Sequence, residues 1–478
     1  MQEASLVING ERYAAASGLT FDRRDPFSDA VVSRAPAACA AEALKAVNAA
    51  AAAFGDWSAT PGHARAALLL KAADALGDRE DAFFDHMAGE VGASRDWVRF
   101  NLKLAQGILR QAAELPALMQ DERVQNAAAG TQSIIRHQPA GVIVGFAPWN
   151  APLTLGFRAI AAPLACGNTV VLKGSELCAR THQLVVELLN DVGLPAGVAN
   201  YVTHAPAQAT EIAEAMIGHP AVRRVNFTGS TRVGREIARM AAQSLKPCLL
   251  ELSGKAPLIV LEDADLDAAA EAAAFGAFFN QGQICMSTER VIVVDSIADA
   301  FVAKLGARAR AMSAGNPRDD RAQLGPLISA EAALRLGGLI EDAVTRGAQV
   351  VAGGSADRAV MQPTVVDHVT SAMRLYHDEC FGPIAAVMRV ADEDEAVSIA
   401  NETEFGLSAA VFSRDVDRAL GVAGRIDSGM CHINGPTVYD DPNMPFGGTK
   451  ASGYGRFGGP GAIREFTETR WIAIHDPV

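Results

Sequence analysis

The chain has 478 residues, of which 49% are hydrophobic and 20% charged, so it has ample apolar material for large cores and is not disordered as a whole. At about 150 residues per domain, this length suggests roughly three domains. The formal net charge of −13 argues against non-specific binding to nucleic acid or to an anionic membrane surface.

The first half of the chain begins with short apolar runs and turn residues, and it then predicts helices from Ala40 to about Leu118. From Gly141 onward, apolar β-branched runs alternate with stretches of helical spacing. The expected strands cover residues 141–147, 169–173 and 223–228, and the expected helices cover residues 151–165, 181–191 and 231–243. This alternation implies right-handed crossovers and a mostly parallel sheet.

A second alternating region begins near Pro257 and continues to about Asn434. Its clearest strands and helices are expected at residues 258–261, 268–280, 290–294 and 298–312. Residues 442–461 are rich in Gly, Pro and Asn and are expected to form a loop, which a final strand follows at 463–474. The sequence therefore predicts an α/β fold with two alternating units that meet near residues 253–256.

The seven cysteines are an odd number and include no CxxC pair, so a disulfide framework is not expected. Cysteine and histidine do not cluster at zinc-site spacing, and no metal is expected. The N-terminus lacks a basic start followed by an apolar run, and no stretch approaches the roughly 20 apolar residues of a membrane span. These features favour a soluble protein in the reducing cytoplasm.

One candidate ligand site is the junction between the strand at 223–228 and the helix that follows it. Helix N-termini expose free N–H groups and the positive end of the helix dipole, and Gly229 has no Cβ to keep a ligand from the backbone. Gly229 and Ser230 therefore form a plausible phosphate seat. An ordinary strand-to-helix connection is the alternative, because the segment lacks the GxGxxG fingerprint and the chain has no Walker loop.

Three side chains are candidates for catalysis. Cys285 follows a glycine-containing turn, and its polar neighbours do not suit the small buried hydrophobe that a free cysteine usually is. Glu251 lies between two leucines in an apolar strand, where a carboxylate is costly unless it is paired, functional or on a solvent-facing side. A desolvated glutamate has a raised pKa, which suits a general base. Asn150 follows a buried strand and either caps the next helix or donates a hydrogen bond to an oxyanion.

Seven short segments follow one another in the order typical of the NAD(P)-dependent aldehyde dehydrogenase superfamily, and the chain resembles that family over nearly its whole length. The segments are Pro148-Trp-Asn150, Lys173-Gly-Ser-Glu176, Phe227-Thr-Gly-Ser230, Glu251-Leu-Ser-Gly-Lys255, Gly282-Gln-Ile-Cys285, Glu379-Cys-Phe-Gly-Pro383 and Pro445-Phe-Gly-Gly-Thr-Lys450. The chain departs from the family pattern at Gly174, where proline is frequent, and at Ser253, where glycine is frequent. Both departures concern local loop geometry rather than the chemistry.

The resemblance implies a catalytic mechanism. Cys285 is expected to be the nucleophile that adds to the aldehyde carbon, while the Asn150 side chain and the backbone N–H of Cys285 hold the oxyanion of the thiohemiacetal. After hydride transfer leaves a thioester, Glu251 is expected to activate the water that releases the carboxylic acid. A free thiol has a pKa near ~8.5, so Cys285 needs activation by the bound cofactor or by Glu251.

The resemblance also implies a nicotinamide cofactor. Lys173 and Glu176 are expected to bind the adenosine ribose. Glu176 would repel a 2′-phosphate by ~4 kcal/mol before screening, at ~4 Å and an effective dielectric constant near ~20, which favours NAD over NADP. The other expected cofactor contacts are Gly229 and Ser230 at the pyrophosphate, Trp149 beside it, Glu379 at the nicotinamide ribose and Phe381 at the nicotinamide ring.

By the same resemblance, the fold is that of an aldehyde dehydrogenase: a modified Rossmann cofactor domain, an α/β catalytic domain and a small β oligomerisation element. Residues 1–121 and 140–252 are expected to bind NAD. Residues 253–445 are expected to form the catalytic domain, and residues 122–139 and 460–478 the oligomerisation element. A strand arm that pairs with the sheet of another subunit implies a homodimer or homotetramer.

The expected substrate is a small aromatic aldehyde of the salicylaldehyde, vanillin or benzaldehyde type. Residues 221–234, 282–290 and 451–459 resemble salicylaldehyde and vanillin dehydrogenases more than betaine-aldehyde or fatty-aldehyde members of the family. Two other classes remain as alternatives, an acylating dehydrogenase and a non-catalytic binding protein. Glu251 argues against the first, because acylating members usually lack the base, and Cys285 argues against the second.

Three residues are expected to line the substrate pocket. Arg158 lies two turns past Asn150, and its apolar neighbours favour an inward position over the alternative of a surface arginine. A guanidinium there is suited to a ring hydroxyl or phenolate. It would equally bind the carboxylate of a small aliphatic semialdehyde, which is the alternative substrate. Trp97 and Tyr439 are expected to add aromatic walls, with an ordinary core position as the alternative for each.

Overall fold

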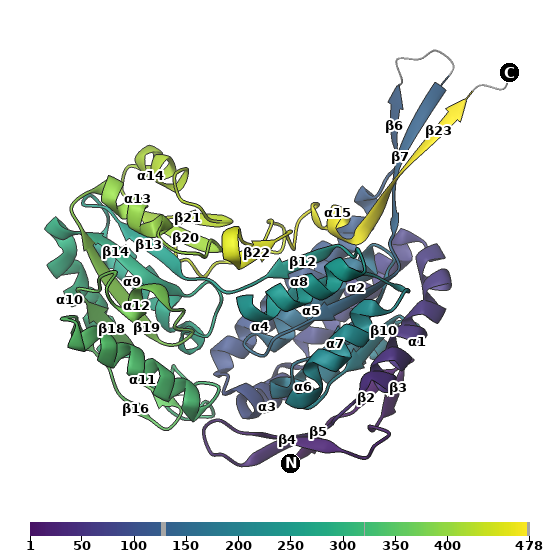
Figure 1. Ribbon diagram of the computed structural model, residues 1–478, viewed down its shortest axis with the longest axis horizontal. Helices are drawn as coiled ribbons and strands as arrows, with labels where there is room; N and C mark the ends of the chain where they lie inside the picture. The colour runs from purple at the N-terminus through teal and green to yellow at the C-terminus, as the bar shows by residue number, and fades with distance from the viewer. Residues whose placement is uncertain (126–130, 320, 476–478) are drawn as a thin grey trace.

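The computed structural model describes residues 1–125, 131–319 and 321–475. The chain folds into two α/β units, each built on its own β-sheet, and an antiparallel β arm projects from the first unit (Figure 1). The last strand of the chain lies on this arm. The arrangement agrees with the α/β fold class expected from the sequence.

The first unit is built on an eight-stranded sheet whose five central strands run parallel. In spatial order these strands are β12 (Cys248–Glu251), β11 (Val222–Thr228), β8 (Val142–Phe146), β9 (Thr169–Lys173) and β10 (Ala199–Val202). Short antiparallel strands extend both edges, namely β22 (Gly453–Tyr454) beyond β12, and β2 (Leu6–Ile8) and β3 (Glu11–Tyr13) beyond β10. The strands expected at 141–147, 169–173 and 223–228 are confirmed.

Helices cover both faces of this sheet, because successive side chains of each strand point to opposite faces. Ile143 packs with the core on one face, whereas Val142 and Val144 pack with the core on the other. The helices on the first face are α2 (Gly62–Gly77), α3 (Glu80–Val91), α4 (Arg95–Leu118), α5 (Pro152–Ala165) and α6 (Ala179–Asp191). Those on the second face are α1 (Ala40–Ala59), α7 (Ala209–Gly218) and α8 (Thr231–Gln243).

The second unit is built on a seven-stranded sheet whose edge strand β15 is antiparallel and whose other strands run parallel. In spatial order the strands are β15 (Gln349–Ala352), β18 (Thr364–Asp367), β19 (Ile384–Val390), β14 (Thr288–Val294), β13 (Ala256–Val260), β20 (Ser408–Phe412) and β21 (Met430–Ile433). The helices are α9 (Leu266–Phe278) and α10 (Asp295–Ala311) on one face, and α11 (Ala330–Thr345), α13 (Glu393–Asn401) and α14 (Val416–Ala423) on the other. Since β12 ends at Glu251 and β13 begins at Ala256, the units meet in the residues between them.

The remaining elements are short. They are strands β1 (Gln2–Glu3), β4 (Thr20–Arg24), β5 (Val31–Pro36), β16 (Ala356–Asp357) and β17 (Val360–Met361), helix α12 (Arg374–His377), and the 3-10 turns η1 (Glu176–Cys178), η2 (Pro206–Gln208), η3 (Phe279–Gly282) and η4 (Lys450–Ser452). Within the described ranges, no helix is both long enough and apolar enough to cross a membrane.

The projecting arm is a three-stranded antiparallel sheet. Its strands are β6 (Glu122–Gln125), β7 (Thr131–Pro139) and β23 (Thr467–His475). The expected final strand therefore begins at Thr467 rather than at residue 463. The reason is that residues 462–466 form helix α15 (Ala462–Phe466), whose apolar side chains pack into the core of the first unit.

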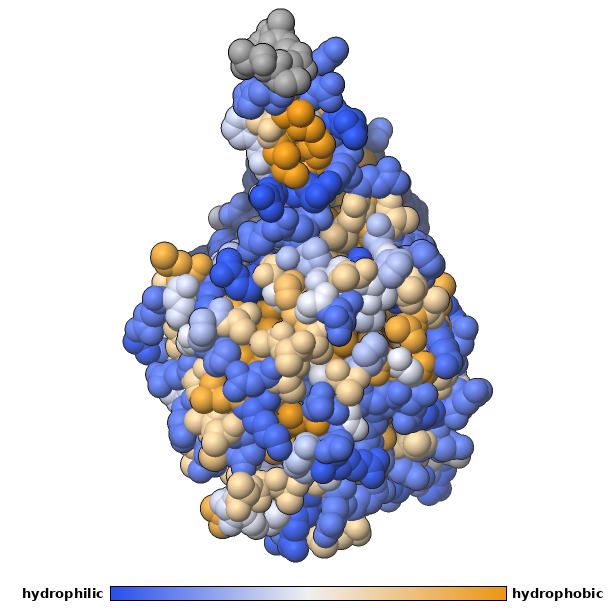
Figure 2. Space-filling view, turned by 90° about the vertical axis from the view of Figure 1, so that its right-hand side faces the viewer, coloured by the Kyte–Doolittle hydropathy of each residue, from blue (hydrophilic) through white to orange (hydrophobic). Residues whose placement is uncertain are grey.

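Apolar side chains lie exposed on this arm. Trp471 is 71% exposed, and Val124 and Ile474 are exposed as well. Figure 2 shows an apolar patch on the arm surrounded by hydrophilic residues. Of the oligomerisation element expected from the sequence, residues 126–130 and 476–478 lie outside the described residues.

Candidate active site

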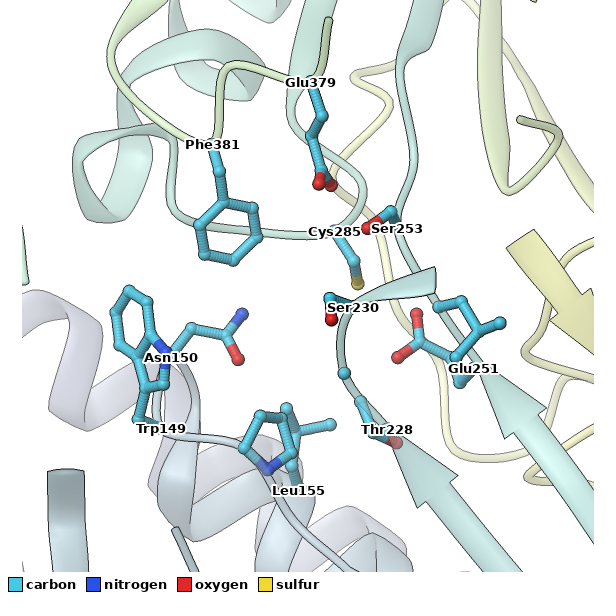
Figure 3. A pocket seen from close by; sticks show the side chains of 13 residues that line it. Trp149, Asn150, Leu155, Thr228, Ser230, Glu251, Ser253, Cys285, Glu379 and Phe381 are labelled. Atoms are coloured by element: carbon cyan, nitrogen blue, oxygen red, sulfur yellow. The ribbon is translucent and has the colours of Figure 1, made fainter. Parts of the chain in front are cut away.

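The candidate site is a cavity of about 270 Å³ between the two units, at the carboxyl ends of the parallel strands of the first sheet (Figure 3). Ligands of open α/β sheets bind at this edge. The lining residues are Pro148, Trp149, Asn150, Leu155, Thr228, Gly229, Ser230, Glu251, Leu252, Ser253, Cys285, Glu379 and Phe381. The cavity therefore brings together all three expected catalytic residues and most of the expected cofactor contacts.

Cys285 lies in a tight loop between η3 and β14 that its neighbours hold in place. Gly282 has a positive φ of 66°, and a Cβ on it would lie 2.2 Å from the carbonyl oxygen of Gly382, so only glycine fits. The Ser287 hydroxyl donates a hydrogen bond to the carbonyl oxygen of Gly282 at 2.9 Å. The loop directs the half-buried Cys285 thiol into the cavity (Figure 3).

The side chain of Asn150 is fixed beside this loop. Its Nδ2 donates a hydrogen bond to the carbonyl oxygen of Gln283 at 3.0 Å. Its main-chain carbonyl accepts hydrogen bonds from Trp97 Nε1 at 2.9 Å and from Asn280 Nδ2 at 3.2 Å. The N-cap residue of α5 is Ala151, so the alternative that Asn150 caps this helix is wrong. The second amide proton of Asn150 is left for an oxyanion formed at Cys285.

Glu251 is the last residue of β12 and is only 1% exposed, so the alternative of a solvent-facing strand glutamate is wrong. Apart from the neighbouring Cys285 thiol, no group of the described residues is a hydrogen-bond partner of its carboxyl oxygens. Burial raises the pKa of Glu251 to about 7, while the Cys285 thiol and the Arg158 guanidinium act in the opposite direction. At neutral pH the group therefore exists in both protonation states, as a general base requires.

Cys285 and Glu251 each affect the pKa of the other. Burial raises the pKa of the Cys285 thiol well above its ordinary value, and the negative charge of Glu251 raises it further. Two anions side by side in a buried site are disfavoured, so a proton released by one group is readily taken by the other. Figure 3 shows both functional groups pointing into the same space.

One wall of the cavity fits a phosphate-containing cofactor. Strand β11 runs into Gly229 and Ser230, and the Ser230 hydroxyl accepts a hydrogen bond from the backbone N–H of Val233 as the N-cap of α8. A Cβ on Gly229 would lie 2.6 Å from the ring of Phe227, so a side chain there is excluded. The N-terminus of α8 therefore borders the cavity with free backbone N–H groups, which is the arrangement that binds a pyrophosphate.

A second part of the wall fits a nicotinamide and its ribose. The rings of Trp149 and Phe381, from different units, meet edge to face with centroids 5.7 Å apart. Glu379 accepts a hydrogen bond from the backbone N–H of Gly254 at 3.2 Å. Burial, and then the negative charge of Glu289, raise the pKa of Glu379 to about 7. An aromatic slot beside a carboxyl offers a ring surface and an acceptor for ribose hydroxyls.

A buried ion pair that the sequence did not reveal fixes the loop that carries Phe381. The carboxylate of Glu289 accepts hydrogen bonds from the backbone N–H groups of Cys380 and Phe381 at 2.7 and 2.9 Å. Lys255 Nζ donates to the same carboxylate at 2.7 Å. Glu289 stands between Thr288 and Arg290 at the start of β14, so it lacks the apolar neighbours that identified Glu251 in the sequence.

Lys173 and Glu176 lie at the carboxyl end of β9 and are not part of the cavity lining among the described residues. Lys173 is in register with Phe146 of β8, one strand away from the segment that carries Trp149. Burial lowers the pKa of Lys173, and the nearby charge of Glu176 opposes this shift. Lys173 and Glu176 therefore lie at the same carboxyl edge of the first sheet as the cavity, beyond the part of the edge that lines it. No cluster of three or more His, Cys, Asp or Glu able to hold a metal ion occurs in the described part of the chain.

The three expected substrate-pocket residues occupy different environments, and none of them lines the main cavity as the structure describes it. Arg158 is 6% exposed, so the surface alternative is wrong, and its Nη2 lies 2.5 Å from Oδ2 of Asp440. Trp97 is buried and stacks on Phe100 with ring centroids 5.2 Å apart. Tyr439 is 55% exposed. Sequence reasoning missed Asp440 and Phe100.

Comparison with known protein families matches residues 13–472 to the Aldehyde dehydrogenase family. The chain therefore belongs to the aldehyde dehydrogenase family, and it is an enzyme of that class. The fold expected from the sequence is confirmed, with one Rossmann-like α/β unit and a second α/β unit that contains Cys285 in the loop before β14. The alternative of a non-catalytic binding protein is wrong.

Individual relatives match over nearly the whole chain. A vanillin dehydrogenase from Pseudomonas fluorescens is 51% identical over 476 residues, covering 100% of this chain and 98% of its own. A salicylaldehyde dehydrogenase from Pseudomonas putida is 48% identical over 473 residues, covering 99% and 98%. The crystal structure of a salicylaldehyde dehydrogenase from Pseudomonas putida G7 complexed with salicylaldehyde superimposes with a TM-score of 0.97 at 47% identity, covering 99% and 98% of the two chains.

Proposed function

We propose that this enzyme oxidises a small aromatic aldehyde to the carboxylic acid, with NAD as the hydride acceptor. The observation that carries the proposal is the convergence of Cys285, Glu251 and Asn150 on one cavity beside the N-terminus of α8. The relatives, which include vanillin and salicylaldehyde dehydrogenases, support the aromatic class of substrate.

The first half of the reaction uses Cys285 as the nucleophile. Its proton passes to Glu251, and Sγ adds to the aldehyde carbon to form a thiohemiacetal. The oxyanion accepts hydrogen bonds from Nδ2 of Asn150 and from the backbone N–H of Cys285; removal of one such donor typically costs about 10²–10³ in rate. A bound nicotinamide supplies the acceptor for the hydride that leaves the substrate carbon. The acyl group then remains on Cys285 as a thioester.

The second half of the reaction uses Glu251 as the base. The proton that Glu251 took from Cys285 first passes to solvent. The Glu251 carboxylate then removes a proton from the water that attacks the thioester, and this proton returns to Sγ as the carboxylic acid leaves, which restores the Cys285 thiol. The pKa of about 7 supports this role, because the carboxylate is populated at neutral pH and still holds a proton firmly enough to drive the transfer. An acylating reaction requires no such base, so the buried Glu251 supports hydrolysis.

The cofactor is proposed to lie along the carboxyl edge of the first sheet. Its contacts run from Phe381 at the nicotinamide ring and Glu379 at its ribose, past Trp149, to Gly229 and Ser230 at the pyrophosphate and Lys173 and Glu176 at the adenosine ribose. The Glu176 carboxylate supports NAD over NADP, because it accepts hydrogen bonds from ribose hydroxyls and repels a 2′-phosphate. On this basis residues 1–121 and 140–252 form the cofactor domain and residues 253–445 the catalytic domain.

The aromatic class of substrate also has structural support. Trp97, Phe100 and Phe279 form a ring cluster with centroid distances of 5.2, 5.1 and 5.5 Å. The hydrogen bond from Trp97 to the Asn150 carbonyl places this cluster next to the proposed oxyanion donor. Flat aromatic substrates pack favourably on such ring faces and edges. Trp97 and the more than half exposed Tyr439 are proposed to border the path of the substrate to the cavity, whose described lining includes neither of them.

The proposed function is tested by NADH or NADPH formation at 340 nm with salicylaldehyde, vanillin, benzaldehyde, succinic semialdehyde and a short aliphatic aldehyde. We expect the highest kcat/KM for a hydroxylated benzaldehyde with NAD, because the ring cluster favours aromatic substrates and Glu176 disfavours the 2′-phosphate of NADP. A preference for succinic semialdehyde would contradict the aromatic assignment while keeping the mechanism. A preference for NADP would contradict the role of Glu176.

The arm is proposed to form the subunit contact of a homodimer or homotetramer. An exposed edge of an antiparallel sheet carries unpaired backbone groups, and on this arm it is accompanied by exposed Trp471, Val124 and Ile474. Two copies related by a twofold axis would cover these groups together. The seven cysteines are all free, which suits a reducing compartment, and we place the enzyme in the cytoplasm.

This contact is tested by light scattering after size exclusion. We expect the wild-type chain to have the mass of a dimer or tetramer, and a double variant, Trp471→Glu with Ile474→Glu, to shift towards the monomer because buried charges oppose association. The matched control is Leu334→Glu, which changes an exposed apolar residue on α11 outside the arm and should keep the wild-type mass. A wild-type monomer at micromolar concentration would contradict the proposal.

A further inference from the structure

Arg158 and Asp440 form a buried ion pair that lines a small second cavity and is not part of the lining of the main one. The two side chains are 6% and 3% exposed, and Nη2 of Arg158 lies 2.5 Å from Oδ2 of Asp440. The guanidinium also lies over the ring of Phe446, 4.3 Å from its centroid. Desolvating two charges is costly, so a buried pair is weak evidence for a purely stabilising role.

The pair adjoins the reacting groups. Helix α5 begins just after Asn150, and Leu155, which lines the main cavity, is one helical turn before Arg158 on the same face. The charges of Arg158 and Asp440 both act on Glu251 and on Cys285, with opposite signs. A substrate bound at Cys285 therefore lies within the electrostatic reach of the pair.

The second oxygen of Asp440 has no assigned partner. Oδ1 is buried and has no hydrogen-bond partner among the residues that the structure describes. A small second cavity of about 20 Å³, lined in part by Arg158, Asp440 and Phe446, adjoins the pair and is large enough for one water-sized group. In the described part of the chain, Oδ1 of Asp440 is therefore an acceptor without a donor. It lies next to the Arg158 guanidinium, whose charge Asp440 already neutralises.

We propose that Asp440 is a specificity-determining residue, which neutralises Arg158 and thereby excludes aldehydes that carry a carboxylate. A free guanidinium binds a substrate carboxylate well, but a guanidinium held by Asp440 leaves that carboxylate facing the negative charge of Asp440. A ring hydroxyl meets no such repulsion and can donate a hydrogen bond to Oδ1. Selection by a repulsive group against the wrong ligand is a general route to specificity. The inference rests on the proposed function, because it explains why an arginine in this position would not select a semialdehyde.

The test compares succinic semialdehyde with its methyl ester, which replaces the charged carboxylate at the far end by a neutral group larger by one methyl. The readout is the ratio of kcat/KM for the acid to kcat/KM for the ester, which a general loss of structure does not change. For Asp440→Asn we expect the ratio to rise by about tenfold or more, because Arg158 is then free to pair with the substrate carboxylate. For Arg158→Met we expect the ratio to fall, because Asp440 then faces the carboxylate alone.

The double variant, Arg158→Met with Asp440→Asn, carries no charge at either position, so its ratio should return towards the wild-type value. Asp441→Asn removes a neighbouring carboxylate that Asn443 already engages, and as the matched control it should keep the wild-type ratio. If Asp440→Asn does not fold, the predicted fall for Arg158→Met still tests the proposal. A ratio that stays within about twofold of wild type in both single variants overturns it. A wild-type preference for the acid over its ester would also overturn it. Failure of the proposed function is distinct, because it would appear as absent turnover of aromatic aldehydes by the wild-type enzyme.

Discussion

Replacing Cys285 by serine lowers kcat/KM for every aldehyde tested by roughly 10⁴-fold or more, the order of loss seen when a covalent nucleophile is removed. The reason is chemical rather than structural, because a serine hydroxyl fills the same space but loses its proton far less readily than a thiol. The measurement is initial-rate NADH formation at saturating NAD. The variant should still bind NAD, since Cys285 contributes no cofactor contact in the proposed mechanism. Binding is measured by the quenching of tryptophan fluorescence, to which Trp149 contributes.

The matched control for this variant is Cys39→Ser. Cys39 is an exposed free cysteine at the N-cap of α1, far from Cys285 in the sequence. Its substitution should leave kcat/KM unchanged. Retention of more than about one hundredth of wild-type activity by Cys285→Ser would contradict the assignment of Cys285 as the nucleophile.

Replacing Glu251 by glutamine slows steady-state turnover by about 10²–10⁴-fold, the usual contribution of a general base. Glu251 takes the Cys285 proton in the first half of the reaction and the proton of water in the second. Because the thiol can also lose its proton to solvent whereas hydrolysis depends on the base, the first turnover should be slowed less than the later ones. The two phases are separated by stopped-flow absorbance at 340 nm, at an enzyme concentration where one NADH per active site is visible. Equal slowing of the first and later turnovers would contradict the role of Glu251 as the base of hydrolysis.

The pH dependence of the wild-type enzyme follows from the same group. The pKa of Glu251 is raised to about 7, and only the carboxylate accepts a proton, so kcat should rise with pH through about 7 where hydrolysis limits the rate. This acidic limb should be lost in Glu251→Gln. Glu379 also has a pKa raised to about 7, so Glu379→Gln is the matched control, which should change the KM for NAD and keep the acidic limb.

Much of the fold follows from local sequence patterns. Strands β8 and β9 are buried on both faces and therefore read as continuous apolar, β-branched runs, and α8 begins and ends where its periodicity begins and ends. Glu251 could be singled out because a carboxylate in an apolar strand is costly without a purpose. Its burial in the structure agrees with that reasoning.

The contacts that were not predicted are those between distant segments. Asp440 is 282 residues from its partner Arg158 and lies next to a Gly- and Pro-rich loop where periodicity carries no information. The pairing of Lys255 with Glu289 depends on the register between β13 and β14, which spacing alone does not provide. The sequence predicts a strand where helix α15 lies, because a five-residue segment is too short for periodicity to distinguish a helix from a strand.

The most direct test of the catalytic role of Cys285 is mass spectrometry of Glu251→Gln quenched in acid after one turnover with benzaldehyde and NAD. We expect the intact chain to gain one benzoyl group and the peptide that contains Cys285 to carry it, because the thioester forms but is hydrolysed slowly. A chain without added mass despite a burst of NADH, or a benzoyl group on any other cysteine, would contradict catalysis through a Cys285 thioester.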